Sequence, residues 1–132
     1  MSHRFPIRVY YEDTDMAGIV YYANYLRYIE RARSDWVREM GIDQLEMKAQ
    51  GVVFAVRRVE ADYIATAVFD DQLEVCTDMT HLTPARMVMT QNITRNGDLL
   101  FAAVVTIVCI GAGGRPARLP AKLRALPITK TG

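Results

Sequence analysis

The sequence predicts an α+β domain in which one long helix is wrapped by a curved antiparallel sheet of about five strands. Apolar residues recur at helical spacing through residues 22–40, which indicates one amphipathic helix. Beyond Gly51 the pattern changes to strand-like segments separated by turn signals. A single helix cannot bury its broad apolar face alone, and a sheet curved around it is the simplest cover. The 132 residues fit one domain spanning 1–132.

The first strand is expected over residues 6–11, whose letters PIRVYY alternate in polarity, and an acidic loop follows it. The helix comes next, and Gly41 is a natural stop for it. Asn24 is a candidate cap for its start, with the alternative that the first turn lies two residues earlier. A short helical turn is expected over residues 43–50. One apolar face of the long helix is formed by Tyr22, Tyr25, Leu26, Ile29, Ala32, Trp36, Val37 and Met40.

The rest of the chain is expected to form strands joined by tight turns. Asn96-Gly97 is the strongest hairpin signal in the sequence, and Thr83-Pro84 marks another turn. Because Arg57 and Arg58 are adjacent in the first of these strands, one of them must face inward or sit at a bulge. The four strands are expected over residues 52–64, 72–82, 86–95 and 98–110.

The final strand and the tail after it carry two further expectations. The strand over residues 98–110 is apolar on both faces, which predicts that both faces are covered. The tail over residues 111–132 is rich in glycine, proline and basic residues, and we expect it to end loosely.

Composition and charge exclude several classes of protein. The net charge of +1 offers no general attraction for nucleic acid or for a membrane surface, so no nucleic-acid partner is expected. The longest apolar run, residues 99–110, is too short to span a membrane as a helix. The N-terminus lacks the apolar core of a signal peptide. Cys76 and Cys109 therefore read as reduced core residues of a cytoplasmic protein.

Several kinds of catalytic site are also missing. The sequence has no phosphate-binding loop and no nucleophile elbow, and no cofactor is predicted. His3 and His81 have no acid or cysteine at ligand spacing, so no metal site is expected, and His3 is placed in a disordered start. Ser2 and Ser34 are poorly placed for a catalytic triad.

The acidic loop, YYEDTDMAGIV, remains as the candidate site. Asp15 precedes the apolar residues 16–20, which predicts partial desolvation of its carboxylate. Gly18 allows the backbone to approach a ligand closely. The first turn of the following helix has unpaired N–H groups that can hold an oxyanion. A carboxylate, free amide donors and aromatic side chains together suit acyl transfer from a carbonyl substrate. The alternative is a polar turn that only favours the helix dipole.

The same stretch, YYEDTDMAGIVYYANYLRYIERAR, resembles the hot-dog-fold acyl-CoA thioesterases of the 4-hydroxybenzoyl-CoA thioesterase type, and most closely the bacterial branch associated with the Tol–Pal system. The shared pattern is D-x-D-x-x-G-x-V-Y followed by Y-x-x-x-x-E-R-A-R. The segments VEADYIATAVFDDQLEV and PARLP extend the resemblance over nearly the whole chain. It implies a hot-dog fold and the hydrolysis of an acyl-CoA to a carboxylic acid and free CoA.

The resemblance also implies roles for single residues. Asp15 matches the catalytic acid, acting as nucleophile or as general base on water. The backbone N–H of Tyr22 matches the donor that polarises the thioester carbonyl; the Tol–Pal branch usually has histidine here. Tyr11 matches a tyrosine common in that branch, with the alternative that it is a strand residue packed on the helix. Glu12 and Asp13 are read as loop polarity or motif geometry.

Substrate and partners follow from the same reading. The phosphates of CoA need basic side chains; the candidates are Arg86, Arg115, Arg118 and Lys122. An exposed sheet edge and an incompletely covered sheet face predict a homo-oligomer, a dimer or a homotetramer. In hot-dog proteins the site usually lies between subunits, so residues between Val56 and Tyr63 are expected to contribute from a neighbouring chain. Two other readings stay open: a hot-dog enzyme of another reaction, and a non-catalytic module that binds acyl groups or a protein.

Overall fold

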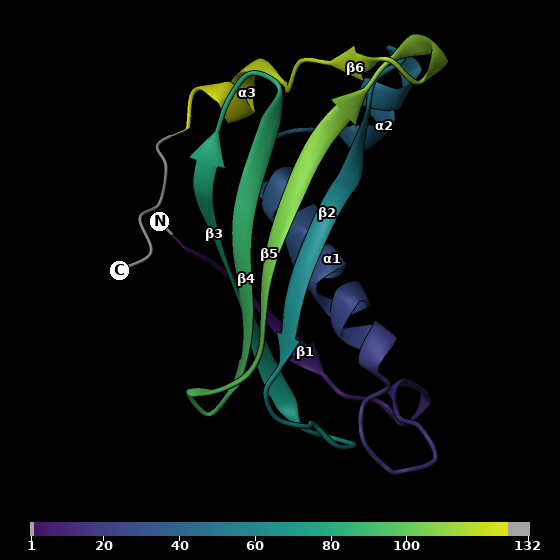
Figure 1. Cartoon of the computed structure of the whole chain (residues 1–132), viewed down its shortest axis with the longest axis vertical. Helices are drawn as coiled ribbons and strands as arrows, with labels where there is room; N and C mark the ends of the chain where they lie inside the picture. The colour runs from purple at the N-terminus through teal and green to yellow at the C-terminus, as the bar shows by residue number, and fades with distance from the viewer. Residues whose placement is uncertain (1, 127–132) are drawn as a thin grey trace.

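The computed structural model, which describes residues 2–126, contains one curved antiparallel sheet with a long helix packed against it (Figure 1). The strands are β1 (His3–Arg8), β2 (Val53–Tyr63), β3 (Gln72–Leu82), β4 (Arg86–Arg95), β5 (Asp98–Ile110) and β6 (Pro116–Ala117). They lie in the order β1-β3-β4-β5-β2, with β6 also pairing β5. The four strands expected after Gly51 are therefore confirmed almost to the residue.

Helix α1 (Tyr22–Glu39) lies behind the sheet in the view of Figure 1 and buries one face. Tyr25 stacks on Phe101 of β5 with ring centroids 5.2 Å apart. The helix ends where Gly41 adopts φ +80°, a conformation that glycine reaches at little cost. The buried residues of α1 are Asn24, Tyr25, Tyr28, Ile29, Ala32 and Val37.

A short helix, α2 (Gln44–Ala49), follows α1, as predicted, and the Asp43 carboxylate caps it by accepting from the amides of Leu45 and Glu46. Among the described residues, no helix combines the length and apolar character needed to cross a membrane.

The turn and bulge signals of the sequence also hold. Asn96 and Gly97 both have positive φ, 51° and 84°, as a two-residue hairpin between β4 and β5 requires. The register between β2 and β5 shifts between Val56 and Arg58, so the adjacent arginines do sit at a bulge.

The N-terminal strand differs from the prediction. It spans His3–Arg8 instead of residues 6–11, and it pairs with β3. His3 is 7% exposed, and its Nε2 lies 2.9 Å from Asp35 Oδ2 and 3.6 Å from Glu39 Oε2 of α1. The expectations of a disordered start and of a histidine without nearby acids were therefore wrong, because the acids come from a helix that is distant in sequence.

The C-terminal segment is packed as far as residue 126. Pro116 pairs with Ile110 of β5, and the short helix α3 (Ala121–Arg124) follows. Leu119 and Leu123 are almost fully buried, at 1% and 0% exposure. The predicted loose tail is thus wrong for this part of the chain. Residues 127–132 lie outside the described residues.

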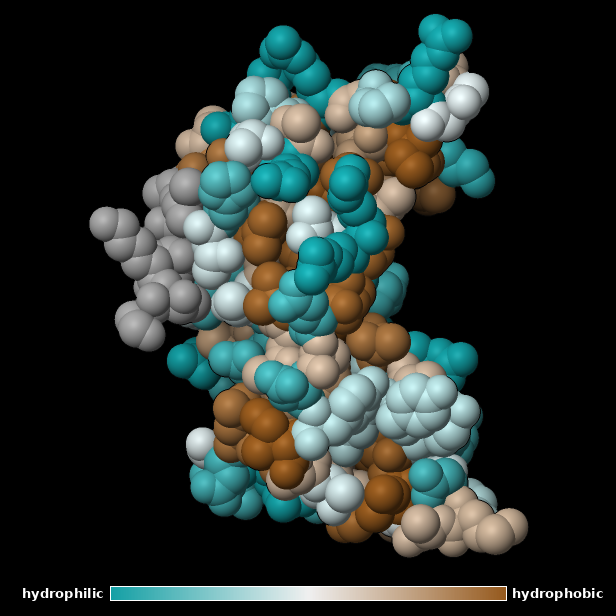
Figure 2. All heavy atoms as spheres, in the orientation of Figure 1, coloured by the Kyte–Doolittle hydropathy of each residue, from teal (hydrophilic) through white to brown (hydrophobic). Residues whose placement is uncertain are grey.

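The sheet ends in β1 on one side and in β2 on the other, and the β2 edge and one sheet face carry exposed apolar side chains. Strand β2 pairs only with β5, and it exposes apolar side chains that include Val56, Val59 and Tyr63. On the face turned away from α1, Val104 of β5 is 39% exposed, so the prediction that both faces of this strand are covered is wrong for the single chain. Figure 2 shows this face, where apolar and polar side chains alternate.

Candidate active site

The acidic loop is a tight turn held at both ends. A β-bridge pairs Thr14 with Val20, and the amide of Asp15 donates to the carbonyl of Ile19 at 2.9 Å. Gly18 has φ +81°, which favours glycine at this position. A second bridge, between Ile19 and Val68, fixes the loop to the segment after β2. The loop backbone is therefore firmly placed relative to the sheet.

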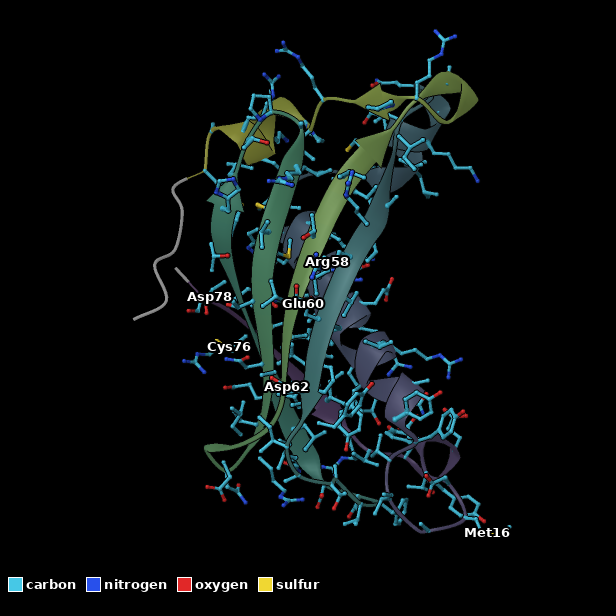
Figure 3. The ribbon with its side chains drawn as sticks, in the orientation of Figure 1. Met16, Arg58, Glu60, Asp62, Cys76 and Asp78 are labelled. Carbon is cyan, nitrogen blue, oxygen red and sulfur yellow. The ribbon has the colours of Figure 1, made fainter. Side chains whose placement is uncertain are left out.

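The carboxylate of Asp15 is oriented but not covered. Its Oδ1 accepts a hydrogen bond from the amide of Ala17 at 2.9 Å, and its side chain is exposed. The predicted desolvation is therefore wrong for the single chain. The apolar residues that follow do not fold back over the acid: Met16 is fully exposed and lies at the tip of the loop, far from the sheet (Figure 3).

The start of α1 carries free amide donors. The helix begins at Tyr22, two residues before the candidate cap Asn24, and Tyr21 precedes it without a side-chain cap. The amide of Asn24 donates to the carbonyl of Tyr21 at 2.8 Å. Among the described residues, the amides of Tyr22 and Ala23 have no hydrogen-bond partner. Two donors at the positive end of an 18-residue helix are thus open to an anionic oxygen.

Asp13 joins the loop to the helix, a role that the sequence analysis missed. It is 8% exposed, and its Oδ2 accepts from the amide of Tyr10 at 2.8 Å. Its carbonyl accepts from the amide of Tyr21 at 2.9 Å and from Asn24 Nδ2 at 2.8 Å. Burial, reinforced by the nearby Asp13 carboxylate, raises the pKa of the Tyr28 phenol. Asp13 accepts a hydrogen bond from the amide three residues before it, as the acid of a capping box does, but tyrosine at position 10 is not a usual capping residue, so the sequence carries little signal of this role.

The aromatic side chains expected behind the acids form a cluster at the helix start. The hydroxyl of Tyr63 donates to the carbonyl of Tyr22 at 3.0 Å. The Tyr63 ring also packs edge-on against Tyr25 and Phe101, with centroids 5.5 and 5.0 Å away. Burial raises the pKa of the Tyr63 phenol.

Tyr11 is not part of this cluster. It lies in a short 3-10 turn, η1 (Tyr11–Asp13), and is 82% exposed. The alternative reading, a strand residue packed on the helix, is therefore wrong. Its proposed role in the site stays a prediction.

The four candidate phosphate ligands gather at the other end of the molecule. Arg86 begins β4, Arg115 and Arg118 flank β6, and all three are exposed. Lys122 lies in α3, where its Nζ donates to the carbonyl of Gly41 at 2.9 Å. In Figure 1 these segments lie at the top, whereas the loop before α1 lies at the bottom. One chain therefore does not bring these cations to Asp15.

Comparison with known proteins gives a consistent result. Residues 9–126 match the model of the thioesterase-like superfamily. The acyl-CoA thioester hydrolase YbgC of Escherichia coli O6:H1 is 41% identical over 125 residues, which cover 94% of this chain and 89% of the relative. The acyl-CoA thioesterase YbgC of Haemophilus influenzae is 37% identical over 123 residues, which cover 92% of this chain and 90% of the relative.

Solved structures agree with the sequence comparison. A probable thioesterase from Bartonella henselae superposes with a TM-score of 0.86 and 37% identity, covering 91% of this chain and 100% of that chain. The curved sheet and its single long helix are thus shared with structures of thioesterases.

Proposed function

The chain belongs to the thioesterase-like superfamily and is an acyl-CoA thioester hydrolase with a hot-dog fold, and we propose that Asp15 and the first amides of α1 form its catalytic centre. One observation supports the proposal: the turn that carries the exposed Asp15 carboxylate leads, through Val20 and Tyr21, into a helix start without a side-chain cap. The bridge between Thr14 and Val20 and the bonds of Asp13 hold these groups in a fixed relation.

The mechanism uses these two elements together. The thioester carbonyl oxygen accepts hydrogen bonds from the amides of Tyr22 and Ala23, which stabilise the negative charge that develops on it. The Asp15 carboxylate either attacks the carbonyl carbon or takes a proton from a water that attacks. The tetrahedral intermediate then collapses, and the CoA sulfur leaves with the electron pair of the broken C–S bond. If Asp15 attacks directly, water hydrolyses the resulting anhydride.

We propose that the complete site lies between two copies of the chain. In one chain Asp15 is exposed, and the candidate phosphate ligands lie at the opposite end of the sheet. A two-fold axis beside β2 would pair the two β2 edges antiparallel and exchange the ends of the two sheets. The cations of one copy would then lie over the loop of the other, which would also remove water from Asp15.

The wider assembly and the location remain predictions. Two such dimers would form the predicted homotetramer, with the half-exposed outer face around Val104 as one available contact. A cytoplasmic location agrees with the free thiols of Cys76 and Cys109.

The catalytic assignment is tested with Asp15→Asn. We expect thiol release from acyl-CoA to fall by about 10²- to 10⁴-fold, because the amide neither attacks nor takes a proton. The matched control is Glu12→Gln, which changes an exposed acid of the same loop and should leave the rate unchanged. Circular dichroism and sedimentation confirm that both variants keep their fold and assembly. A rate for Asp15→Asn equal to that of the wild type would remove Asp15 from the mechanism.

The shared site is tested with Val59→Asp. Val59 is 38% exposed on the open edge strand, so a charge there would be buried without a partner in the assembly. The substitution should therefore dissociate the copies, and thiol release should be lost with the assembly. Leu45→Asp is the control, because Leu45 is 80% exposed on α2. Light scattering after gel filtration gives the assembly state. Dissociated Val59→Asp chains with a full rate of hydrolysis would show that each chain has a complete site.

A further inference from the structure

A histidine and two carboxylates meet where the start of β1 lies against the second half of α1. His3 Nε2 lies 2.9 Å from Asp35 Oδ2 and 3.6 Å from Glu39 Oε2. One donor atom from each of the three side chains lies within 4.8 Å of the other two. Asp35 and Glu39 are four residues apart on α1, so both extend from the same face of the helix. Spacing along the sequence does not reveal this cluster, because His3 precedes Asp35 by 32 residues.

The three side chains differ in their exposure to solvent. The side chain of His3 is 5% exposed, that of Asp35 is 32% exposed and that of Glu39 is 64% exposed. The His3 ring also stacks on Phe5, with an angle of 16° between the ring planes, so packing holds the imidazole in one orientation. The side of the cluster formed by Glu39 is open, and an ion can enter there and keep water as a further ligand.

The cluster carries more negative charge than the imidazole balances. Within residues 2–126, neither Asp35 nor Glu39 forms an ion pair with an arginine or a lysine. Protonated on Nε2, His3 offers one N–H to two carboxylates; protonated on Nδ1 alone, it turns a lone pair toward them. Nδ1 is buried and has no hydrogen-bond partner among the described residues, so no bond at that nitrogen selects the tautomer. A divalent cation satisfies all three groups, because it accepts the Nε2 lone pair and one oxygen from each carboxylate.

We propose that His3, Asp35 and Glu39 bind one divalent transition-metal ion of the Zn²⁺ class, which fastens β1 to α1. Imidazole and carboxylate are both ligands of Zn²⁺, and three protein ligands leave a fourth position for water. Ligand atoms around a tetrahedral Zn²⁺ lie roughly 3.4 Å apart, and the separations of 2.9 and 3.6 Å are close to this value. Mg²⁺ prefers six oxygen ligands and fits the set poorly.

The proposed metal site is separate from the proposed catalytic centre. Asp35 lies about 20 Å along α1 from Tyr22, at ~1.5 Å per residue. An ion at this distance strengthens the packing of the N-terminal strand and takes no part in thioester hydrolysis within the same chain. The proposal therefore does not depend on the role of Asp15.

Calorimetric titration of the full, untagged chain with ZnCl₂ tests the site. We expect one Zn²⁺ per chain with a Kd of about 10 µM or tighter, and no binding isotherm with MgCl₂ at the same concentrations. His3→Gln and Asp35→Asn should each weaken the binding of Zn²⁺ by about 100-fold or more, because each removes a ligand. Excess Zn²⁺ should raise the Tm of the wild type by several degrees and leave that of the two variants unchanged.

Matched controls separate this site from other zinc ligands. His81→Gln changes the other histidine of the chain, which is exposed near the end of β3, and should keep the affinity of the wild type. Cys76→Ser removes a half-buried thiol and should also leave the affinity unchanged. Asp15→Asn should bind Zn²⁺ like the wild type, even if its hydrolytic rate is lost.

A further variant keeps the test decisive if His3→Gln or Asp35→Asn does not fold. Glu39→Gln changes an exposed side chain and should weaken the binding of Zn²⁺ by about tenfold or more. Wild-type protein without saturable binding of Zn²⁺ would overturn the proposal. Unchanged affinity in Glu39→Gln would also overturn it, and so would loss of affinity in His81→Gln or Cys76→Ser, because the ion would then have other ligands.

Discussion

The hydroxyl of Tyr63, the last residue of β2, donates a hydrogen bond to the carbonyl of Tyr22, the first residue of α1, over 3.0 Å. The Tyr63 ring also contacts Tyr25 and Phe101, which anchors it on the sheet. The free amides at the start of α1 are therefore positioned by the edge strand as well as by the acidic loop.

Tyr63→Phe tests this link, because it removes the hydroxyl and keeps the ring. We expect kcat to fall several-fold with little change in KM, since the donor for the developing oxyanion is less firmly held. The free energy of unfolding should fall by about 1 kcal/mol in urea titration. Tyr10→Phe, at a 60% exposed tyrosine, is the control for removal of a phenol hydroxyl. Equal kcat in both variants would exclude a positioning role for Tyr63.

The role of the Tyr22 amide can be separated from that of its side chain. Proline is tolerated at the first position of a helix, and it lacks the N–H group. Tyr21 has φ −62° and ψ 132°, a conformation that allows a following proline. Tyr22→Pro should therefore fold and lose about 10²-fold or more of kcat. Tyr22→Ala keeps the amide and should retain most of the rate in the same assay. Comparable losses in the two variants would assign the function to the side chain.

Gly18→Ala should affect catalysis more than stability. Gly18 and Gly51 have similar positive φ values, +81° and +88°, and an added Cβ meets no neighbour at either site. Each substitution should cost about 1 kcal/mol of folding free energy. Only the change at Gly18 disturbs the turn that carries Asp15, so only that variant should lose thiol-release activity. Parallel urea titrations and rate measurements check this, and a similar loss of rate in both variants would contradict it.

The ion pair between Arg95 and Asp71, with 2.7 Å between Nη1 and Oδ2, should give a pH-dependent contribution to stability. Burial acts to raise the pKa of Asp71, but hydrogen bonds from the Val68 amide and Arg95 outweigh it and lower this pKa below 3.8. The stabilisation is therefore present above pH 3.8 and is lost as the pH falls through the lowered value.

Arg95→Met removes this pair. At pH 7 it should reduce the free energy of unfolding by roughly 0.5–1 kcal/mol, and the difference from wild type should shrink below pH 3.8. Arg8→Met breaks the more exposed pair with Asp70 and should have a smaller effect. Chemical denaturation at several pH values measures both. A deficit for Arg95→Met that stays constant with pH would show that its cause is lost packing instead.

Local signals account for the parts of the fold that were predicted correctly. Asn96-Gly97, Gly41 and the paired Arg57-Arg58 each act on their own backbone, so a single sequence reveals the hairpin, the helix stop and the bulge. The aromatic cluster at the helix start was also predicted in outline, because Tyr22 and Tyr25 lie in one short run.

The features that were missed depend on distant residues. The burial of His3 comes from Asp35 and Glu39, and that of Leu119 from packing of the tail against the turn at Pro84, whose carbonyl accepts from the Leu119 amide. The exposure of Asp15 was missed for a different reason. Its apolar neighbours Met16 and Ala17 are exposed, whereas Val20 packs into the core away from the acid, and only the folded backbone shows this.

The exposed apolar edge of β2 makes the stability of this chain depend on the protein concentration. If two copies pair along this edge, their association buries apolar side chains that are exposed to water in the single chain. By mass action, thermal unfolding would then start from an assembled state, and its midpoint would rise as the protein is concentrated. Dilute preparations would melt earlier and lose hydrolytic rate before they lose secondary structure.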